Sequence, residues 1–99
     1  VRRPIVFVDG ENVRRSVWPN IPRDELERLV AEWGRAEEVE PRVVWEDAET
    51  ADDRIAREAA EVERPYWLVT SDRGLRDRAG GRAARVLGGG TFARELRRT

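Results

Sequence analysis

The sequence predicts an α/β fold: a three-layer α/β/α sandwich around a mostly parallel sheet of about four strands. Short apolar runs alternate with longer amphipathic segments four times over 99 residues, and no internal repeat, low-complexity tract or linker interrupts them. Parallel strands with right-handed crossovers place every helix N-terminus at the carboxyl edge of the sheet. We therefore expect one domain over residues 1–99. Its ligand site should lie at that edge where the strand order reverses, between the first and third strands.

The first strand and the first long helix are the clearest elements. The apolar run 5–8 ends at Asp9 and Gly10 and is typical of a strand buried on both faces. Pro22 is expected to open a helix, and Gly34 fits just past its end. The inward stripe of this helix has the spacing i, i+3, i+4 and i+7 and consists of Leu26, Leu29, Val30 and Trp33.

The second and third strands are the apolar runs 43–45 and 66–69. Between them, Thr50 is expected to cap a helix, because a threonine side chain at this position can accept a hydrogen bond from a free backbone N–H. The helix should turn three apolar side chains toward the sheet: Ile55, Ala59 and Val62.

The last third of the chain predicts two more helices and one strand. A short helix is expected over about 72–79, and a weaker fourth strand over 84–87. The glycine run 88–90 then breaks the chain, and Thr91 is expected to cap the last helix. One apolar pair at i, i+4 supports that helix, namely Phe92 and Leu96.

The composition excludes several classes of enzyme. The chain has no histidine, cysteine or lysine, so it cannot form a Ser-His-Asp triad, a disulfide, a P-loop or a lysine Schiff base. The net charge is −1, but residues 1–63 hold 10 Arg against 17 acids, whereas residues 64–99 hold 9 Arg against 3 acids. Such asymmetry suits a protein that binds a phosphate backbone near metal-binding carboxylates, although a solvated surface is the simpler explanation of the imbalance alone.

Three acidic motifs each follow a short apolar run: VDGEN at 8–12, ETADD at 49–53 and TSD at 70–72. Parallel strands would bring these motifs to one edge of the sheet, and carboxylate oxygens are the preferred ligands of hard divalent cations. Asp9 is the first candidate ligand, because Asn12 can lie on the same face of the following helical turn and support a metal or a substrate. The alternative for Asp9 is an ordinary Asp-Gly turn.

The second and third motifs supply further candidate catalytic acids. Thr50 and Asp53 have the spacing of a capping box, which gives Asp53 a structural alternative. Asp52 lies on the sheet-facing side of the helix, and a buried carboxylate there needs a metal or an arginine as its partner. Asp72 follows the third strand and is the third candidate metal ligand, although an aspartate at a helix N-cap is common. Asp77 is a weaker fourth candidate.

Arginines border the predicted cleft and are candidate ligands for RNA phosphates, because a guanidinium group binds phosphate oxygens bidentately. They are Arg14, Arg15, Arg73, Arg76 and Arg78. A solvated surface or ion pairing is an equal alternative for them. Glu11 is expected at the surface. Trp18, in the turn SVWPN, is the tryptophan expected to be exposed, since the other three fall in packing patterns.

Four motifs, VDGEN, ETADDRI, LVTSDRGL and GGGTFARELRR, occur in this order over nearly the whole chain. This set resembles the NYN domain, specifically its YacP-like branch within the PIN-like nuclease superfamily. The resemblance implies a PIN-like α/β/α sandwich and a metal-dependent ribonuclease that uses Mg²⁺ or Mn²⁺. The implied acids and their supporting amide map onto Asp9, Asn12, Asp52 or Asp53, and Asp72. The stretch 12–42 is shorter than the usual insertion of the family.

We therefore expect a metal-dependent endoribonuclease that hydrolyses RNA phosphodiester bonds at a carboxylate-held site. The alternatives are an RNA-binding module of the same fold that does not cleave, a phosphatase with Asp9 as nucleophile, and an interaction domain whose acids only cap helices. RNA is the expected partner, with mRNA on the ribosome as one candidate. No run approaches the roughly 20 apolar residues that span a bilayer, so we expect a cytoplasmic protein with no membrane contact. The oligomeric state stays open.

Overall fold

The computed structural model describes residues 2–98. Its sheet is four-stranded and entirely parallel, with the order β2-β1-β3-β4, so the α/β prediction is confirmed. The strand order reverses between β1 and β3, as the sequence predicted. The strands are β1 Ile5–Asp9, β2 Glu40–Val44, β3 Tyr66–Val69 and β4 Arg85–Leu87.

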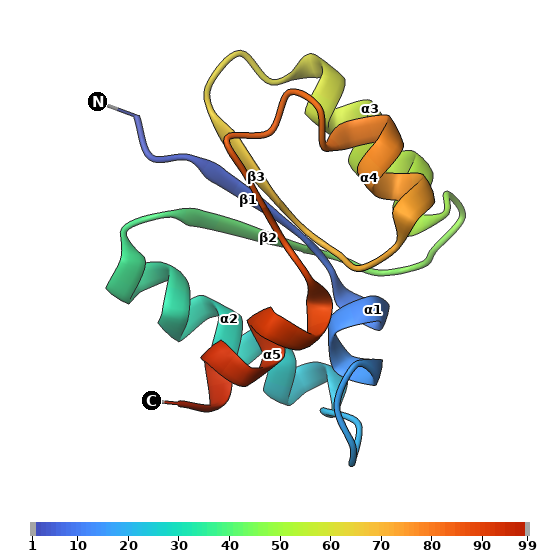
Figure 1. Cartoon of the computed structure of the whole chain (residues 1–99). Coiled ribbons are helices and arrows are strands. Elements are labelled where there is room, and N and C mark those ends of the chain that lie inside the picture. Colours follow the sequence, from blue (N-terminus) through green and yellow to red (C-terminus); the bar gives the residue numbers. More distant parts are fainter. Residues whose placement is uncertain (1, 99) are drawn as a thin grey trace.

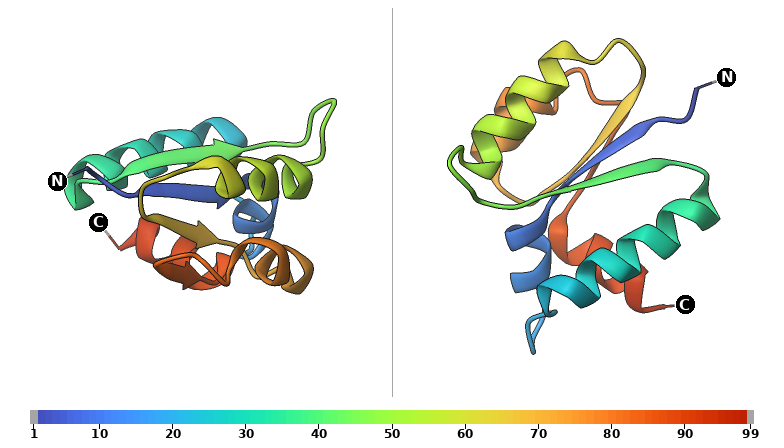
Figure 2. Two further views of the ribbon diagram at one scale, coloured as in Figure 1. Left: turned by 90° about the horizontal axis from the view of Figure 1, so that it is seen from above. Right: turned by 180° about the vertical axis from the view of Figure 1, so that it is seen from behind.

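The helices form two layers, one on each face of the sheet (Figures 1 and 2). Helices α3 and α4 cover one face, while α1, α2 and α5 cover the other. Their bounds are α1 Gly10–Arg15, α2 Arg23–Glu37, α3 Ala51–Glu61, α4 Arg73–Ala79 and α5 Gly89–Arg97. None of the helices in the described part of the chain is long and apolar enough to cross a membrane.

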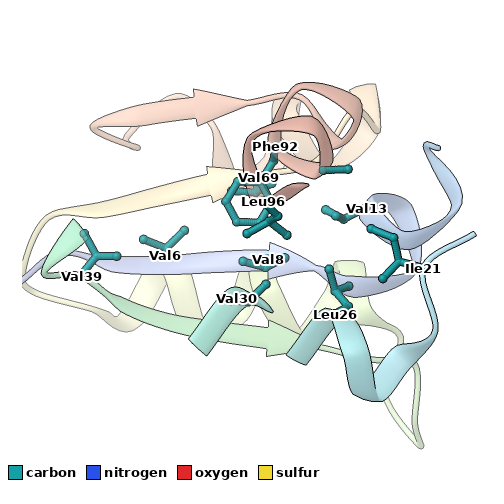
Figure 3. Packing of buried hydrophobic residues seen from close by; sticks show 11 residues of the cluster. Val6, Val8, Val13, Ile21, Leu26, Val30, Val39, Val69, Phe92 and Leu96 are labelled. Atoms are coloured by element: carbon teal, nitrogen blue, oxygen red, sulfur yellow. The ribbon is translucent and has the colours of Figure 1, made fainter. Parts of the chain in front are cut away.

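The central strand β1 separates two hydrophobic cores. Its five residues are all buried, and alternate side chains point to opposite faces of the sheet. Val6 and Val8 pack with the α1, α2 and α5 side (Figure 3), whereas Ile5 and Phe7 pack with α3 and α4. Because both faces are covered, β1 reads in the sequence as an unbroken apolar run. Its last residue, Asp9, is thereby held at the carboxyl edge, paired in register with Val44.

The end of the α2 helix and the start of β2 differ from the sequence prediction. Gly34 lies inside α2 rather than past its end. A Cβ at Gly34 would come within 2.7 Å of two ring carbons of Pro41 on β2, so the missing side chain permits close packing of helix and strand. The helix continues to Glu37 and ends at Glu38, which has a left-handed φ of 58°. The strand spans 40–44 rather than 43–45, and Trp45 lies just beyond it.

The start of α5 is also different from the prediction. Gly88 is the N-cap and Gly89 is the first helical residue, so Thr91 lies inside the first turn instead of capping it. The physical reason is a close contact with α1: a Cβ on Gly89 would overlap the side-chain oxygen of Asn12. Two of the three glycines therefore belong to the helix and do not form a flexible break.

Candidate metal-binding and catalytic site

An open pocket of about 720 Å³ lies at the carboxyl edge of the sheet. Its walls come from the end of β1 with α1, the β2–α3 connection with the start of α3, and the β3–α4 connection. Six of the lining residues are acids and two are arginines: Asp9, Glu11, Asn12, Arg15, Ser16, Glu46, Thr50, Asp52, Asp53, Asp72 and Arg78. Every one of the predicted catalytic residues therefore lines this one pocket.

Asp9 is the most deeply buried of these acids, with 6% of its surface exposed. Its carboxylate accepts a hydrogen bond of 2.9 Å from the hydroxyl of Thr70 at the end of β3. Burial raises the pKa of the Asp9 carboxyl; the Thr70 hydrogen bond opposes this, and the negative charges of Asp52 and Asp72 add to it. The three predicted metal ligands thus lie within one another's electrostatic field.

Thr70 links two of these acids across the strand reversal. Its hydroxyl donates to Asp9 and accepts a hydrogen bond of 3.1 Å from the backbone N–H of Asp72. Asp72 is the N-cap of α4, and its Oδ1 accepts a hydrogen bond of 2.9 Å from the N–H of Leu75. Asp72 therefore has the capping role expected of it and also borders the pocket. No role for Thr70 was predicted from the sequence, because a threonine after a strand is not typical of any particular functional site.

Hydrogen bonds fix the orientation of the Asn12 side-chain amide. This orientation decides whether its oxygen or its NH₂ group is available in the pocket. Its Oδ1 accepts a hydrogen bond of 2.8 Å from the N–H of Ser71. Ser71 Oγ in turn accepts one of 2.8 Å from the N–H of Gly89. A backbone N–H must face the amide oxygen, so the NH₂ group lies on the other side. That NH₂ group has no hydrogen-bond partner among residues 2–98, and Asn12 lines the pocket. Asn12 can therefore act there as a donor.

The structure distinguishes Asp52 from Asp53. Thr50 caps α3 as predicted, its side chain accepting a hydrogen bond of 3.1 Å from the Asp53 N–H. The exposed Asp53 carboxylate pairs with Arg78 at 2.9 Å, and this hydrogen bond is the main cause of its lowered pKa. Asp52 is half-buried, and burial, followed by the charges of Asp72 and Glu46, raises its pKa. Asp52 therefore belongs to the crowded acidic group, whereas Asp53 is neutralised by an arginine.

Glu46 is an acid of the pocket that the sequence reading missed. It follows Trp45 after β2, and its Oε1 accepts a hydrogen bond of 3.2 Å from the Ala51 N–H at the start of α3. The signal that could have found it is the same one that identified Asp9: a carboxylate placed just beyond an apolar run. Asp77, the weaker fourth candidate, lines a separate small hollow between α3 and α4.

The side chain of Glu11 is less exposed than the sequence predicted, and it forms ion pairs with three arginines. Its side chain is 22% exposed and forms ion pairs with Arg14 at 3.3 Å, Arg15 at 3.6 Å and Arg23 at 2.9 Å. The Arg23 guanidinium also lies over the Trp45 ring, 5.2 Å from its centroid. Glu11 therefore holds Arg15 at the margin of the pocket.

The remaining predicted RNA-binding arginines lie in different settings. Arg14 also donates to the carbonyl of Ile21 at 3.1 Å, and Arg76 donates to the carbonyl of Thr70 at 2.9 Å, so both guanidinium groups brace the backbone. Arg73 is exposed beside Asp72 and makes no ion pair within the described range 2–98. Their part in RNA binding stays a prediction.

The donor set suits a hard cation, because every acid of the pocket offers oxygen and the chain contains no histidine or cysteine. Over the residues that the structure describes, however, no three acidic side chains are arranged closely enough to enclose an ion by themselves. Mg²⁺ commonly takes only one or two protein carboxylates and keeps several waters. The arrangement therefore fits a sparse site that substrate phosphates complete.

Comparison with solved structures identifies a protein of the same fold. The crystal structure of Rae1 (YacP) from Bacillus subtilis superimposes with a TM-score of 0.71 and 24% sequence identity, covering 95% of this chain and 75% of that one. No family model and no curated protein sequence matches the chain. The match shows that the chain has the fold of YacP, as the motif resemblance implied.

Proposed function

We propose that this protein is a metal-dependent endoribonuclease that hydrolyses RNA phosphodiester bonds with Mg²⁺ or Mn²⁺ held by Asp9, Asp52 and Asp72. The observation that carries the proposal is the crowding of these carboxylates, which come from three separate strand ends and face one pocket. Mutual repulsion of this kind lowers stability unless a cation compensates for it. The motif resemblance to the YacP-like branch of the NYN domain supports the same reading, and mRNA on the ribosome is one candidate substrate.

The side chains of the pocket can divide the work of phosphodiester hydrolysis. A divalent cation held by the carboxylates supplies Lewis acidity at the phosphate and lowers the pKa of water. Thr70 fixes the position of Asp9, and through its contact with the Asp72 backbone it fixes both acids together. The free NH₂ group of Asn12 can donate a hydrogen bond to a phosphate oxygen, because its carbonyl oxygen is already bound to Ser71.

Two arginines of the pocket are suited to hold the phosphates beside the scissile one. Arg15 contacts Glu11 and Arg78 contacts Asp53, and both arginine side chains are largely exposed, at 69% and 49%. Ion pairs of exposed arginines contribute little to stability, so a phosphate can replace the carboxylate at little cost. Binding of RNA should accordingly weaken as the salt concentration rises.

The test uses labelled single-stranded and hairpin RNA with the wild-type protein and two matched variants, in Mn²⁺, Mg²⁺ or EDTA. Asp9→Asn removes one carboxylate charge and keeps an oxygen that can accept the Thr70 hydrogen bond. Asp77→Asn is the control, since Asp77 lies on α4 but outside the pocket. We expect cleavage by the wild type and by Asp77→Asn that needs metal, and none by Asp9→Asn.

A second readout is independent of activity. A cation that binds only the folded state raises the melting temperature, by mass action. We expect Mn²⁺ to raise the melting temperature of the wild type and of Asp77→Asn more than that of Asp9→Asn. Equal shifts in all three proteins would contradict Asp9 as a ligand.

The alternative function is an RNA-binding module of the same fold that does not cleave. One observation favours it: Arg15 and Arg78 line the pocket with largely exposed side chains and can bind RNA phosphates without a metal. This alternative predicts salt-sensitive RNA binding of equal strength in the wild type and Asp9→Asn, with no metal-dependent product.

A further inference from the structure

Trp18 is the most exposed large apolar side chain in the part of the chain that the structure describes. Its exposed fraction is 86%, compared with 38% for Val86, the next such residue. The other three tryptophans are partly buried against the α2 and α5 core. An exposed indole offers a flat aromatic face on which a nucleobase can stack.

The loop that carries Trp18 is held firmly at both ends. Ile21 is fully buried; its N–H donates to the Arg14 carbonyl and its carbonyl accepts from Arg14 Nε, both at 3.1 Å. Ser16 Oγ donates to the Val13 carbonyl at 2.6 Å. Figure 1 shows this loop projecting from the body of the protein between α1 and α2. Trp18 is therefore presented on a fixed support.

The position of Trp18 connects it to the pocket. Arg15 and Ser16 line that pocket, and Trp18 is only two residues beyond Ser16. Two residues span at most about 7 Å of chain. This length of about 7 Å corresponds to about two nucleotides along a stacked strand. A strand that places one phosphate in the pocket can therefore bring a neighbouring base to Trp18.

The surroundings of Trp18 favour a nucleic acid over a protein as the partner. Arg14 and Arg15 precede the loop, and Arg97 of α5 donates to the Pro19 carbonyl at 3.5 Å. An exposed aromatic ring with arginines beside it is the composition of single-strand binding surfaces, which combine base stacking with backbone charge contacts. Among the described residues the other exposed large apolar side chain is Val86 on β4, so Trp18 is not part of the contiguous apolar patch that marks a protein docking surface.

We propose that Trp18 is a stacking platform for one nucleobase of a single-stranded RNA whose backbone enters the acidic pocket. Stacking on one face of the indole requires an unpaired base, so Trp18 makes the site select unpaired RNA over duplex. This inference rests on the proposed function in one respect, namely that the pocket accepts RNA.

The experiment measures binding in EDTA, where cleavage plays no part. Fluorescently labelled single-stranded RNA and a duplex of the same sequence are titrated with wild type, Trp18→Ala, Trp18→Phe and the control Val86→Ala. Val86 is the other exposed large apolar residue, and it lies on β4 outside the pocket. We expect Trp18→Ala to bind the single strand roughly 5- to 150-fold more weakly, Trp18→Phe to lie between, and Val86→Ala to match the wild type.

A scan with single abasic positions identifies the stacked base. One abasic position should weaken binding to the wild type and have no further effect on Trp18→Ala, because both changes remove the same contact. Equal affinities of wild type and Trp18→Ala for the single strand, or an equal loss for single strand and duplex, would overturn the stacking role. If the Trp18→Ala protein binds and cleaves RNA as well as the wild type does, the stacking role is refuted but the proposed function is not. A wild type that binds no RNA in EDTA and cleaves none in Mn²⁺ or Mg²⁺ would remove the proposed function as well.

Discussion

Gly10 provides the sharpest test of how the pocket is built, because the residue after Asp9 has no room for a side chain. A Cβ at Gly10 would lie 2.5, 2.6 and 2.9 Å from three carbons of the Trp45 ring. Carbon atoms pack favourably at about 3.5–4.0 Å, so in Gly10→Ala the ring must move by about 1 Å. The ring is partly buried against the core, and the Arg23 guanidinium lies over it, which opposes that movement.

The expected cost of Gly10→Ala follows from two opposing effects. Overpacking of a core contact costs about 1–3 kcal/mol, while alanine gains about 0.5–1 kcal/mol over glycine in a helix. We expect a net loss of about 1 kcal/mol, which lowers the melting temperature of a domain of this size by about 4–8 °C. Thermal unfolding followed by circular dichroism measures this shift. The control is Gly81→Ala, since no atom lies within 4 Å of a Cβ there. If both variants melt at the same temperature, Trp45 does not pack on Gly10 as described.

Two further predictions concern neighbouring glycines and one ion pair. Gly89→Ala would overlap Asn12 and should lower the free energy of unfolding by about 1–3 kcal/mol. A Cβ at Gly90 would lie 3.4 Å from the end of the flexible Arg94 side chain and 3.9 Å from Ser16, so Gly90→Ala should raise the free energy of unfolding by about 0.5–1 kcal/mol. Shifts of the same sign for the two variants in urea unfolding would contradict this prediction. The hydrogen bond from Arg64 is the main cause of the lowered pKa of Glu40. The Glu40 carboxylate therefore stabilises the fold above pH 4.5, its unperturbed pKa. This stabilisation is lost as the pH falls through the lower pKa of the folded state. Glu40→Gln should therefore cost about 0.2–1 kcal/mol at pH 7 and progressively less as the pH falls below 4.5, and a difference that does not change with pH would exclude the ion pair as its cause.

The elements that depend on local pattern could be predicted from the sequence. The third strand has the predicted bounds 66–69, because a continuous apolar run between turn residues leaves little choice of register. Thr50 and Asp72 cap their helices as expected, since capping joins residues only three positions apart. The gathering of acids in one pocket also followed from topology, because parallel strands bring their carboxyl ends to one edge.

The features that the sequence could not predict depend on contacts between one structural element and another. The sequence pattern of Gly34 is that of a helix terminator, but in the structure Gly34 packs closely against Pro41. Gly89 lies in a run that resembles a flexible break, but in the structure it packs closely against Asn12. Arg76 was a candidate phosphate ligand, yet its guanidinium donates to the carbonyl of Thr70 in the connection that precedes its helix. Such contacts leave no local pattern, and only the folded chain reveals them.

The dipeptide Thr70-Ser71 has a consequence for the order of events during synthesis. Its two hydrogen bonds to the first motif span 61 and 59 positions of the chain, to Asp9 and Asn12, and Ser71 also binds Gly89 near the C-terminal end. Contacts so far apart in sequence form late, because the intervening chain must be ordered first. While the chain is emerging, the early acids therefore lack the partners that fix them. Ser71 is fixed from its other side only when α5 docks, so the residues that orient Asn12 for the pocket include one that lies outside it.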